Sequence, residues 1–231
     1  MNRGGGSVNG RYCVVIPAFQ AERTIGKVVR AIKSQELSVV VIDDGSRDRT
    51  AAAASAEGAL VISHLKNLGK GAALRAGFSY ALRSGFDGVI TMDSDGQHDA
   101  EEIQLLVHAG EQQHAGIVLG NRMADPGAMP RVRRLTNRFM SAVISRLARQ
   151  PIPDSQCGFR FIRKEVLQSL PLRATRFEIE SELLLGAAVR RWKIVSVPVR
   201  SHYSNHESHI RPLRDTVRFL GLVVRYLTGK R

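Results

Sequence analysis

The feature that most constrains this fold is the regular alternation of short apolar runs with longer segments of helical periodicity. Five runs typical of β-strands occur at 12–17, 37–42, 59–63, 89–92 and 116–119. Segments with apolar residues at helical spacing lie between them, at 21–33, 48–56, 69–82 and 100–109. The strand runs are nearly continuous apolar stretches rather than alternating ones, which is typical of a parallel sheet covered by helices on both faces. The sequence therefore predicts an α/β fold with a mostly parallel sheet.

The second half of the chain has longer helices and more positive charge. It predicts helices at 131–148, 178–189 and 212–227 and a strand at 193–199. The Gly/Ser/Asn-rich stretch 1–10 is expected to be a disordered leader. We therefore expect one α/β domain over 11–210, made of the halves 11–122 and 123–210, followed by a basic amphipathic helix over 211–231.

Polar loops follow four of the predicted strands, at 17–20, 43–46, 93–98 and 120–122. In sheets of this kind, ligands bind beyond the carboxyl ends of the strands. Each loop alone could be a turn, but four of them at one edge predict a binding site.

The loop 93–98 reads Asp-Ser-Asp-Gly-Gln-His. Alternate residues of an extended segment point the same way, so Asp93 and Asp95 could present two carboxylates to one cation. Mg²⁺ and Mn²⁺ prefer oxygen ligands of this kind. The alternative is a solvated acidic turn. Asp-x-Asp-Gly also matches the nucleophile motif of haloacid-dehalogenase-type phosphatases, but that motif follows the first strand, whereas three strands precede it here.

The formal net charge of +13 predicts an anionic partner, which could be a nucleic acid, a phosphorylated substrate or an acidic membrane surface. Six arginines and no acidic residue lie within 131–149. A nucleic-acid-binding domain would explain the charge but not the acidic loop, and only Trp192 and four tyrosines are available for base stacking. We therefore expect no nucleic-acid partner. No apolar run reaches the ~18 residues of a membrane span.

An ordered set of short motifs makes the chain resemble a family-two glycosyltransferase of GT-A (Rossmann-like) fold, in the branch of dolichyl- or polyprenyl-phosphate mannosyl- and glucosyltransferases. Each motif is short, but the set spans about residues 12–210 in the family's order. The motifs are Val-Ile-Pro-Ala-Phe at 15–19, Val-Ile-Asp-Asp-Gly-Ser-Arg-Asp at 41–48, Asn-Leu-Gly-Lys-Gly at 67–71, Met-Asp-Ser-Asp-Gly-Gln-His at 92–98, Gly-Asn-Arg at 120–122 and Cys-Gly-Phe-Arg at 157–160.

The resemblance implies that the 11–122 half binds a nucleotide-diphosphate sugar, GDP- or UDP-linked. The expected donor-binding residues are Pro17, Phe19, Asp44, Lys70 and Asp93. The expected ligands of a Mg²⁺ or Mn²⁺ ion bridging the diphosphate are Asp93, Asp95 and Gln97. Lys70 would reach the phosphates, and Gly69 and Gly71 would let the backbone pass close to the donor. His98 is expected either to contact the sugar or to support the metal ligands.

The 123–210 half would bind the acceptor. The residues expected to act in catalysis are Asp95, Arg122, Arg138, Asp154 and Glu180. Arg122 and Arg138 would bind the acceptor phosphate or the departing diphosphate, because arginine binds phosphate in a bidentate manner. Ser208, His209 and Arg211 would also bind the acceptor, where this branch typically carries a Ser-Lys pair and an arginine. Asp154 and Glu180 would face the sugar or the acceptor.

The expected reaction is metal-dependent, inverting transfer of a sugar to a membrane-associated acceptor. A polyprenyl phosphate is already anionic and needs no strong base, whereas a hydroxyl of a glycan or glycolipid would need one, for which Asp154 is the candidate. We expect a cytoplasmic enzyme, peripheral on the inner face of an anionic membrane. The last helix would either lie on that membrane or pack on protein, including a homodimer partner.

Overall fold

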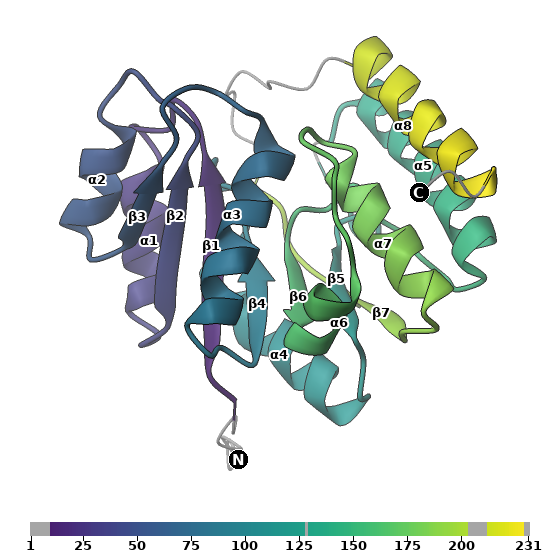
Figure 1. Cartoon of the computed structure of the whole chain (residues 1–231), viewed down its shortest axis with the longest axis horizontal. Helices are drawn as coiled ribbons and strands as arrows, with labels where there is room; N and C mark the ends of the chain where they lie inside the picture. Colours follow the sequence, from purple (N-terminus) through teal and green to yellow (C-terminus); the bar gives the residue numbers. More distant parts are fainter. Residues whose placement is uncertain (1–9, 128, 203–211, 229–231) are drawn as a thin grey trace.

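In the computed structural model, which describes residues 10–127, 129–202 and 212–228, a seven-stranded sheet forms the centre of the molecule (Figure 1). The strands are β1 (Tyr12–Ala18), β2 (Ser38–Asp43), β3 (Leu60–Ser63), β4 (Gly88–Thr91), β5 (Ile117–Asn121), β6 (Arg160–Arg163) and β7 (Ile194–Pro198). Their order is β3-β2-β1-β4-β6-β5-β7, and only β6 runs antiparallel to its neighbours. The predicted α/β fold with a mostly parallel sheet is confirmed.

Each face of the sheet is covered by helices because alternate strand residues point to opposite sides. In β1, Cys13 and Val15 belong to one apolar core, whereas Val14 and Ile16 belong to the other. The helices are α1 (Ile25–Lys33), α2 (Thr50–Ala56), α3 (Lys70–Arg83), α4 (Ile103–Gln112), α5 (Arg131–Ala148), α6 (Lys164–Ser169), α7 (Ile179–Val189) and α8 (Pro212–Leu227), and a 3-10 turn (Ala100–Glu102) precedes α4.

The layers follow from these two cores. Residues of α1, α2 and α4 form one core with one face of the sheet, and residues of α3, α5, α6, α7 and α8 form the other core. In Figure 1, α3, α6 and α7 lie in front of the sheet, and α8 lies at the end of the molecule opposite α2. Both α5 and α8 pack against α7.

Most predicted elements are present within a few residues of their expected bounds, and three differences matter. α1 begins at Ile25 rather than at residue 21, and α6 was not predicted. β6, from the expected acceptor half, lies between β4 and β5 of the expected donor half, so the two halves share one sheet. Within α8, Phe219 and Leu222 are buried, whereas Leu220 and Val224 are exposed.

The topology brings the polar loops together at one edge of the sheet, meaning the end at which the parallel strands have their carboxyl ends. β1, β2, β4 and β5 all end there, and β6 begins there because it runs in the opposite direction. The loop that leads into β6 is therefore added to the four loops predicted from the sequence. The candidate functional site lies at this edge.

Candidate active site

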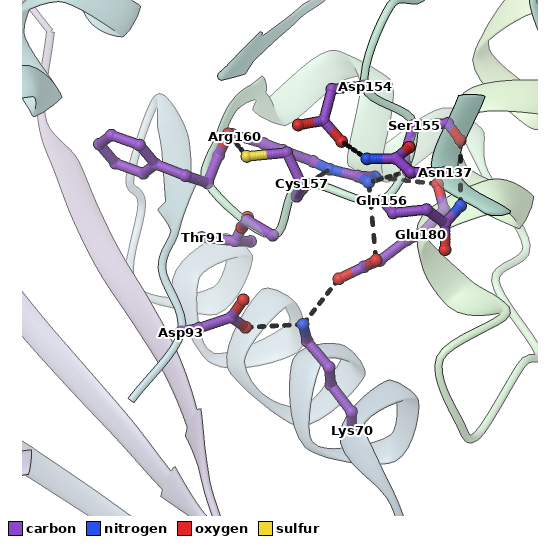
Figure 2. Close-up of polar contacts among 12 residues, drawn as sticks. Lys70, Thr91, Asp93, Asn137, Asp154, Ser155, Gln156, Cys157, Arg160 and Glu180 are labelled. Carbon is purple, nitrogen blue, oxygen red and sulfur yellow. Dashed lines mark hydrogen bonds and ion pairs between the residues drawn. The ribbon is translucent and has the colours of Figure 1, made fainter. Parts of the chain in front are cut away.

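Four alternating charges form the centre of the site (Figure 2). The Lys70 Nζ lies 2.6 Å from Asp93 Oδ1 and 2.7 Å from Glu180 Oε1. On the far side of Glu180, the Arg160 guanidinium is 3.9 Å from Oε2. All four side chains are largely buried, with Arg160 2% exposed. The structure thus brings together the predicted residues Lys70, Asp93 and Glu180 from three separate elements.

Lys70 is held by the turn that opens α3. Gly69, immediately before it, has φ 101°, a conformation that favours glycine. The Asp44 carboxylate accepts hydrogen bonds from the backbone N–H groups of Leu68, at 2.9 Å, and Gly69, at 2.7 Å, and pairs with His64 Nδ1. Asp44, predicted to contact the nucleoside, therefore fastens the end of β2 to the start of α3.

The glycines on either side of Lys70 pack closely against the 174–176 segment. A Cβ at Gly69 would lie 2.4 Å from the carbonyl oxygen of Thr175, and one at Gly71 would lie 2.6 Å from that of Ala174. The glycines therefore leave room for the 174–176 segment, and their expected place beside the donor stays a prediction. This segment leads toward α7, the helix that contains Glu180, whose carboxylate pairs with Lys70.

The Asp93 carboxylate is fixed from two sides. A Cβ at Gly158 would lie 2.5 Å from Asp93 Oδ2, so only a glycine fits beside this oxygen. Burial by itself would raise the pKa of Asp93, but the Lys70 ammonium outweighs burial and lowers the pKa to about 2. Asp93 is therefore an anion throughout the physiological pH range.

Asp95 is the surplus negative charge of the site. The charges of the other four side chains cancel, because Lys70 and Arg160 are positive and Asp93 and Glu180 are negative. Among the described residues, no cationic side chain lies within ion-pair distance of Asp95. Burial and the Asp93 charge raise the pKa of Asp95, and its Oδ1 accepts a hydrogen bond from the backbone N–H of Gln97.

Two neighbouring carboxylates and an amide oxygen suit a hard divalent cation. The Asp93, Asp95 and Gln97 side chains therefore fit such an ion by their chemistry. The described part of the chain contains no group of three His, Cys, Asp or Glu side chains placed to hold a metal, so Gln97 or a ligand oxygen would have to complete the set.

His98 lies against the same loop. Its ring centroid is 5.1 Å from that of Phe159, and burial lowers its pKa to about 4, with Arg122 and Lys70 opposing its charged form. The ring is therefore neutral at pH 7, and its Nδ1 is buried without a hydrogen-bond partner among the described residues.

Arg122 and Asp154 form a buried, hydrogen-bonded ion pair. The Arg122 Nε lies 2.8 Å from Asp154 Oδ2 and its Nη2 lies 3.0 Å from Oδ1. The Arg122 backbone N–H and Asn137 Nδ2 donate to the same carboxylate. Four hydrogen bonds occupy the roughly four lone-pair positions of a carboxylate. Asp154 is also fully buried, so it would have to give up one of these hydrogen bonds to act as a base, and its expected role as a base stays a prediction.

The arginines of α5 divide between two faces. Arg138, the predicted phosphate ligand, is exposed, whereas its neighbour Asn137 is the residue that faces Asp154. Arg133 and Arg134, one turn earlier on the side of Asn137, are partly buried, and the charge of Arg133 acts on Asp95. The structure therefore favours Arg133 and Arg134 over Arg138 for contact with an anion at this edge.

The remaining predicted residues are less tightly placed. Pro17 and Phe19, at the end of β1 and just after it, are partly exposed at the same edge. The Gln97 carbonyl oxygen accepts the His202 backbone N–H, which ties the loop after β7 to the acidic loop. Ser208, His209 and Arg211 lie outside the described residues, so their expected role in acceptor binding remains a prediction.

Sequence reasoning missed the role of Arg160. Its guanidinium donates to the carbonyl oxygens of Ser155, Cys157 and Glu180 at 2.7–2.9 Å, which fastens the loop before β6 to α7. A signal was present, since an arginine lies inside the apolar stretch 159–162. A buried charge of this kind requires a full set of partners.

Comparison with known proteins identifies similar chains. A family model described as "Glycosyl transferase family 2" matches residues 13–170. A UDP-N-acetylglucosamine–dolichyl-phosphate N-acetylglucosaminyltransferase of Methanococcus voltae is 28% identical, over 84% of this chain and 86% of the relative. A polyprenol monophosphomannose synthase of Mycolicibacterium smegmatis is 29% identical, over 82% of this chain and 76% of the relative.

A similar solved structure is that of glucosyl-3-phosphoglycerate synthase from Mycobacterium tuberculosis, in complex with Mn²⁺, UDP and glucosyl-3-phosphoglycerate. The TM-score is 0.72 at 24% identity, and the match covers 99% of this chain and 85% of that one. At this identity the likeness shows the shared GT-A fold alone.

Proposed function

Because the chain belongs to glycosyl transferase family 2, we propose that it moves a sugar from a nucleoside-diphosphate sugar to a lipid phosphate. We propose that the reaction requires a divalent cation held by Asp93, Asp95 and Gln97. The observation that carries this proposal is the surplus carboxylate of Asp95 beside the Asp93–Lys70 pair, at the edge of the sheet where ligands bind.

Each residue of this cluster has a role in the proposal. The cation would stabilise the negative charge that develops on the departing nucleoside diphosphate. Lys70, on a rigid helix and held by Glu180, would bind a diphosphate oxygen as a point charge. Gly158 leaves room for the Asp93 carboxylate, and Arg160 fixes the loop that contains Gly158.

A lipid phosphate is the acceptor that agrees best with the site. The relatives named above are described by dolichyl phosphate and polyprenol monophosphomannose. A phosphate oxygen is already a nucleophile, so no base is needed, and the one base predicted for a hydroxyl acceptor, Asp154, is fully occupied by Arg122 and Asn137. Arg133 and Arg134 supply positive charge at the same edge. Transfer to a hydroxyl of a glycolipid is the second candidate.

The proposal is tested by incubating the protein with Mg²⁺ or Mn²⁺, UDP- and GDP-linked sugars and a polyprenyl phosphate, and by measuring nucleoside-diphosphate release. We expect turnover that EDTA abolishes. Asp95→Asn should lose turnover while its thermal unfolding stays close to that of the wild type. Asp87→Asn, the same change at the opposite edge of the sheet, is the control. Turnover that survives EDTA, or a fully active Asp95→Asn protein, would contradict the metal assignment. Turnover only with a hydroxyl-bearing glycolipid would favour the second candidate.

A lipid acceptor requires the enzyme to meet a membrane, and we propose that α5 and α8 together form the contact. Among the described residues no helix is both long enough and apolar enough to span a bilayer. Six large apolar side chains of these two helices are 45–71% exposed, namely Val132, Leu135, Phe139, Leu220, Val224 and Leu227. They recur at the helical spacings i, i+3, i+7 and i, i+4, i+7, so each set forms a stripe.

Charge favours an anionic lipid surface over a second copy of the chain. Arg131, Arg138 and Arg146 are exposed on α5, and 131–149 contains no acidic residue to pair with them. Symmetric pairing of this surface would bring like charges together, whereas anionic headgroups would neutralise them. Apolar residues combined with arginines are typical of helices that lie in the membrane interface.

Sedimentation with liposomes tests the membrane contact. Leu135→Glu combined with Val224→Glu should reduce binding to vesicles that contain phosphatidylserine. Leu105→Glu, at a 43% exposed leucine of α4, should not. Unchanged sedimentation of the double variant would refute the membrane contact, and a loss of self-association in light scattering would indicate a dimer surface instead.

A further inference from the structure

We propose that Lys70 competes with the divalent cation for Asp93, so that the cation binds weakly to the free protein and tightly only together with the donor diphosphate. This inference rests on the proposed function and concerns how the same site is regulated. Lys70 would thus be a positioning residue that couples metal binding to donor binding.

The first step of the argument is geometric. The Lys70 Nζ lies 2.6 Å from Asp93 Oδ1, a distance typical of a strong charge-assisted hydrogen bond. Gly158 packs against both carboxylate oxygens, since a Cβ there would lie 2.5 Å from Oδ2 and 2.8 Å from Oδ1, which leaves little room around the carboxylate for a cation beside the ammonium. A cation that uses Asp93 must therefore displace the ammonium from Oδ1 or share this oxygen with it.

The second step concerns where Lys70 can go. Its Nζ is already 2.7 Å from Glu180 Oε1, and the Phe177 ring centroid lies 5.8 Å from it. Glu180 is in turn held by Arg160. If Lys70 leaves Asp93, Glu180 keeps it at the site, where the diphosphate offers a new anionic partner. Without the diphosphate, Lys70 would give up one charged partner and gain none.

The third step is the charge balance. With Asp93, Asp95, Glu180, Lys70 and Arg160 all ionised, the cluster carries one net negative charge. A divalent cation alone would make it positive, and a diphosphate would restore a negative total. Without Lys70, the cation alone would bring the cluster to neutrality. Like charges in a partly buried site oppose each other more strongly than in water.

The inference predicts cation binding in the absence of any sugar donor. Mn²⁺ affinity is measured from the free Mn²⁺ signal in electron paramagnetic resonance, with and without UDP or GDP. Without a nucleotide, Lys70→Met should bind Mn²⁺ on the order of tenfold to hundredfold more tightly than the wild type. This factor corresponds to the free energy of one charge-assisted hydrogen bond. The factor by which the nucleotide strengthens Mn²⁺ binding should be smaller in this variant, because the coupling between the two ligands is reciprocal.

Two controls isolate the effect. Lys70→Arg keeps the charge and should stay close to the wild type. Lys164→Met removes another lysine that pairs with an aspartate, Asp87, at 2.7 Å on the opposite edge of the sheet, and should change nothing. Lys70→Ala replaces Lys70→Met if the latter does not fold.

Equal or weaker Mn²⁺ binding by Lys70→Met or Lys70→Ala would overturn the inference. So would Lys70→Arg behaving like Lys70→Met. These results differ from failure of the proposed function, which would appear as no Mn²⁺ binding by the wild-type protein even with UDP or GDP present.

Discussion

The buried pair of Arg122 and Asp154 allows a demanding test of the way the site is built. The two side chains are 4% and 0% exposed, and Asp154 accepts three hydrogen bonds from Arg122 and one from Asn137. Arg122→Met would leave the carboxylate buried without its cation. Removing one partner of a buried pair costs about 3–5 kcal/mol. A loss of this size is a large fraction of the ~5–15 kcal/mol by which a protein of this kind is stable.

The double variant Arg122→Met/Asp154→Leu separates pairing from packing. An apolar pair of similar volume avoids the desolvation of two charges, so we expect the double variant to be more stable than either single variant. The Asn137 amide and the backbone N–H at position 122 then lose their acceptor, at a cost of about 1–3 kcal/mol each. The two substitutions should therefore show a coupling energy of several kcal/mol, far from additive.

The assay is urea unfolding followed by circular dichroism at pH 7 and pH 4. In the wild type, burial would raise the pKa of Asp154, but Arg122 outweighs it and the pKa is lowered. This pair therefore stabilises the fold fully above the unfolded-state pKa of about 3.9, and the stabilisation declines as pH falls toward the lower folded pKa.

In Arg122→Met, burial is no longer opposed, so the pKa of Asp154 should rise. The carboxyl can then bind a proton at pH 4, and the destabilisation should be smaller there than at pH 7. If Arg122→Met lowered the free energy of unfolding by less than about 1 kcal/mol, the range of exposed salt bridges, the buried ion pair would be refuted. Additive single-variant effects would refute it too.

Two further predictions concern the scaffold of the site. Asp44→Ala should lower the free energy of unfolding by about 1–3 kcal/mol, because it leaves the N–H groups of Leu68 and Gly69 without their acceptor; an unchanged urea midpoint would argue against this fastening. Gly77→Ala should destabilise the fold by about 1–3 kcal/mol through overpacking, because the new Cβ would lie 2.3 Å from Val15 Cγ1 in the core. The matched control is Gly26→Ala, whose Cβ would lie no nearer than 3.7 Å to a neighbouring atom. Equal stability of the two variants would contradict the close packing at Gly77.

Much of the fold followed from local patterns. The runs that became β1 to β5 are mostly β-branched or apolar, and they could be recognised because strand formation depends on neighbouring residues. The antiparallel β6 and the short α6 were harder, since four to six residues carry little periodic signal. The direction of β6 depends on its partners β4 and β5 rather than on its own residues.

The faces of the helices show the same limit. The sequence of α8 correctly predicted an amphipathic helix over 212–227, but its apolar residues surround more than one face. Phe219 and Leu222 became buried because α7 lies on their side, and Leu220 and Val224 remained exposed. A helical wheel cannot choose between two apolar faces when the packing partner is unknown.

By itself, the sequence determined the chemistry at the edge of the sheet, that is, two carboxylates at Asp93 and Asp95 and a lysine at position 70. Only the tertiary structure decided which charges meet. Lys70 and Glu180 are 110 residues apart in the chain, and Arg122 and Asp154 are 32 apart. The physical reason is that a pattern of residues specifies local conformation, whereas an ion pair depends on burial and distance, which arise only when distant segments pack. Packing placed Asp154 in a buried ion pair with Arg122, and it placed Lys70 against Asp93.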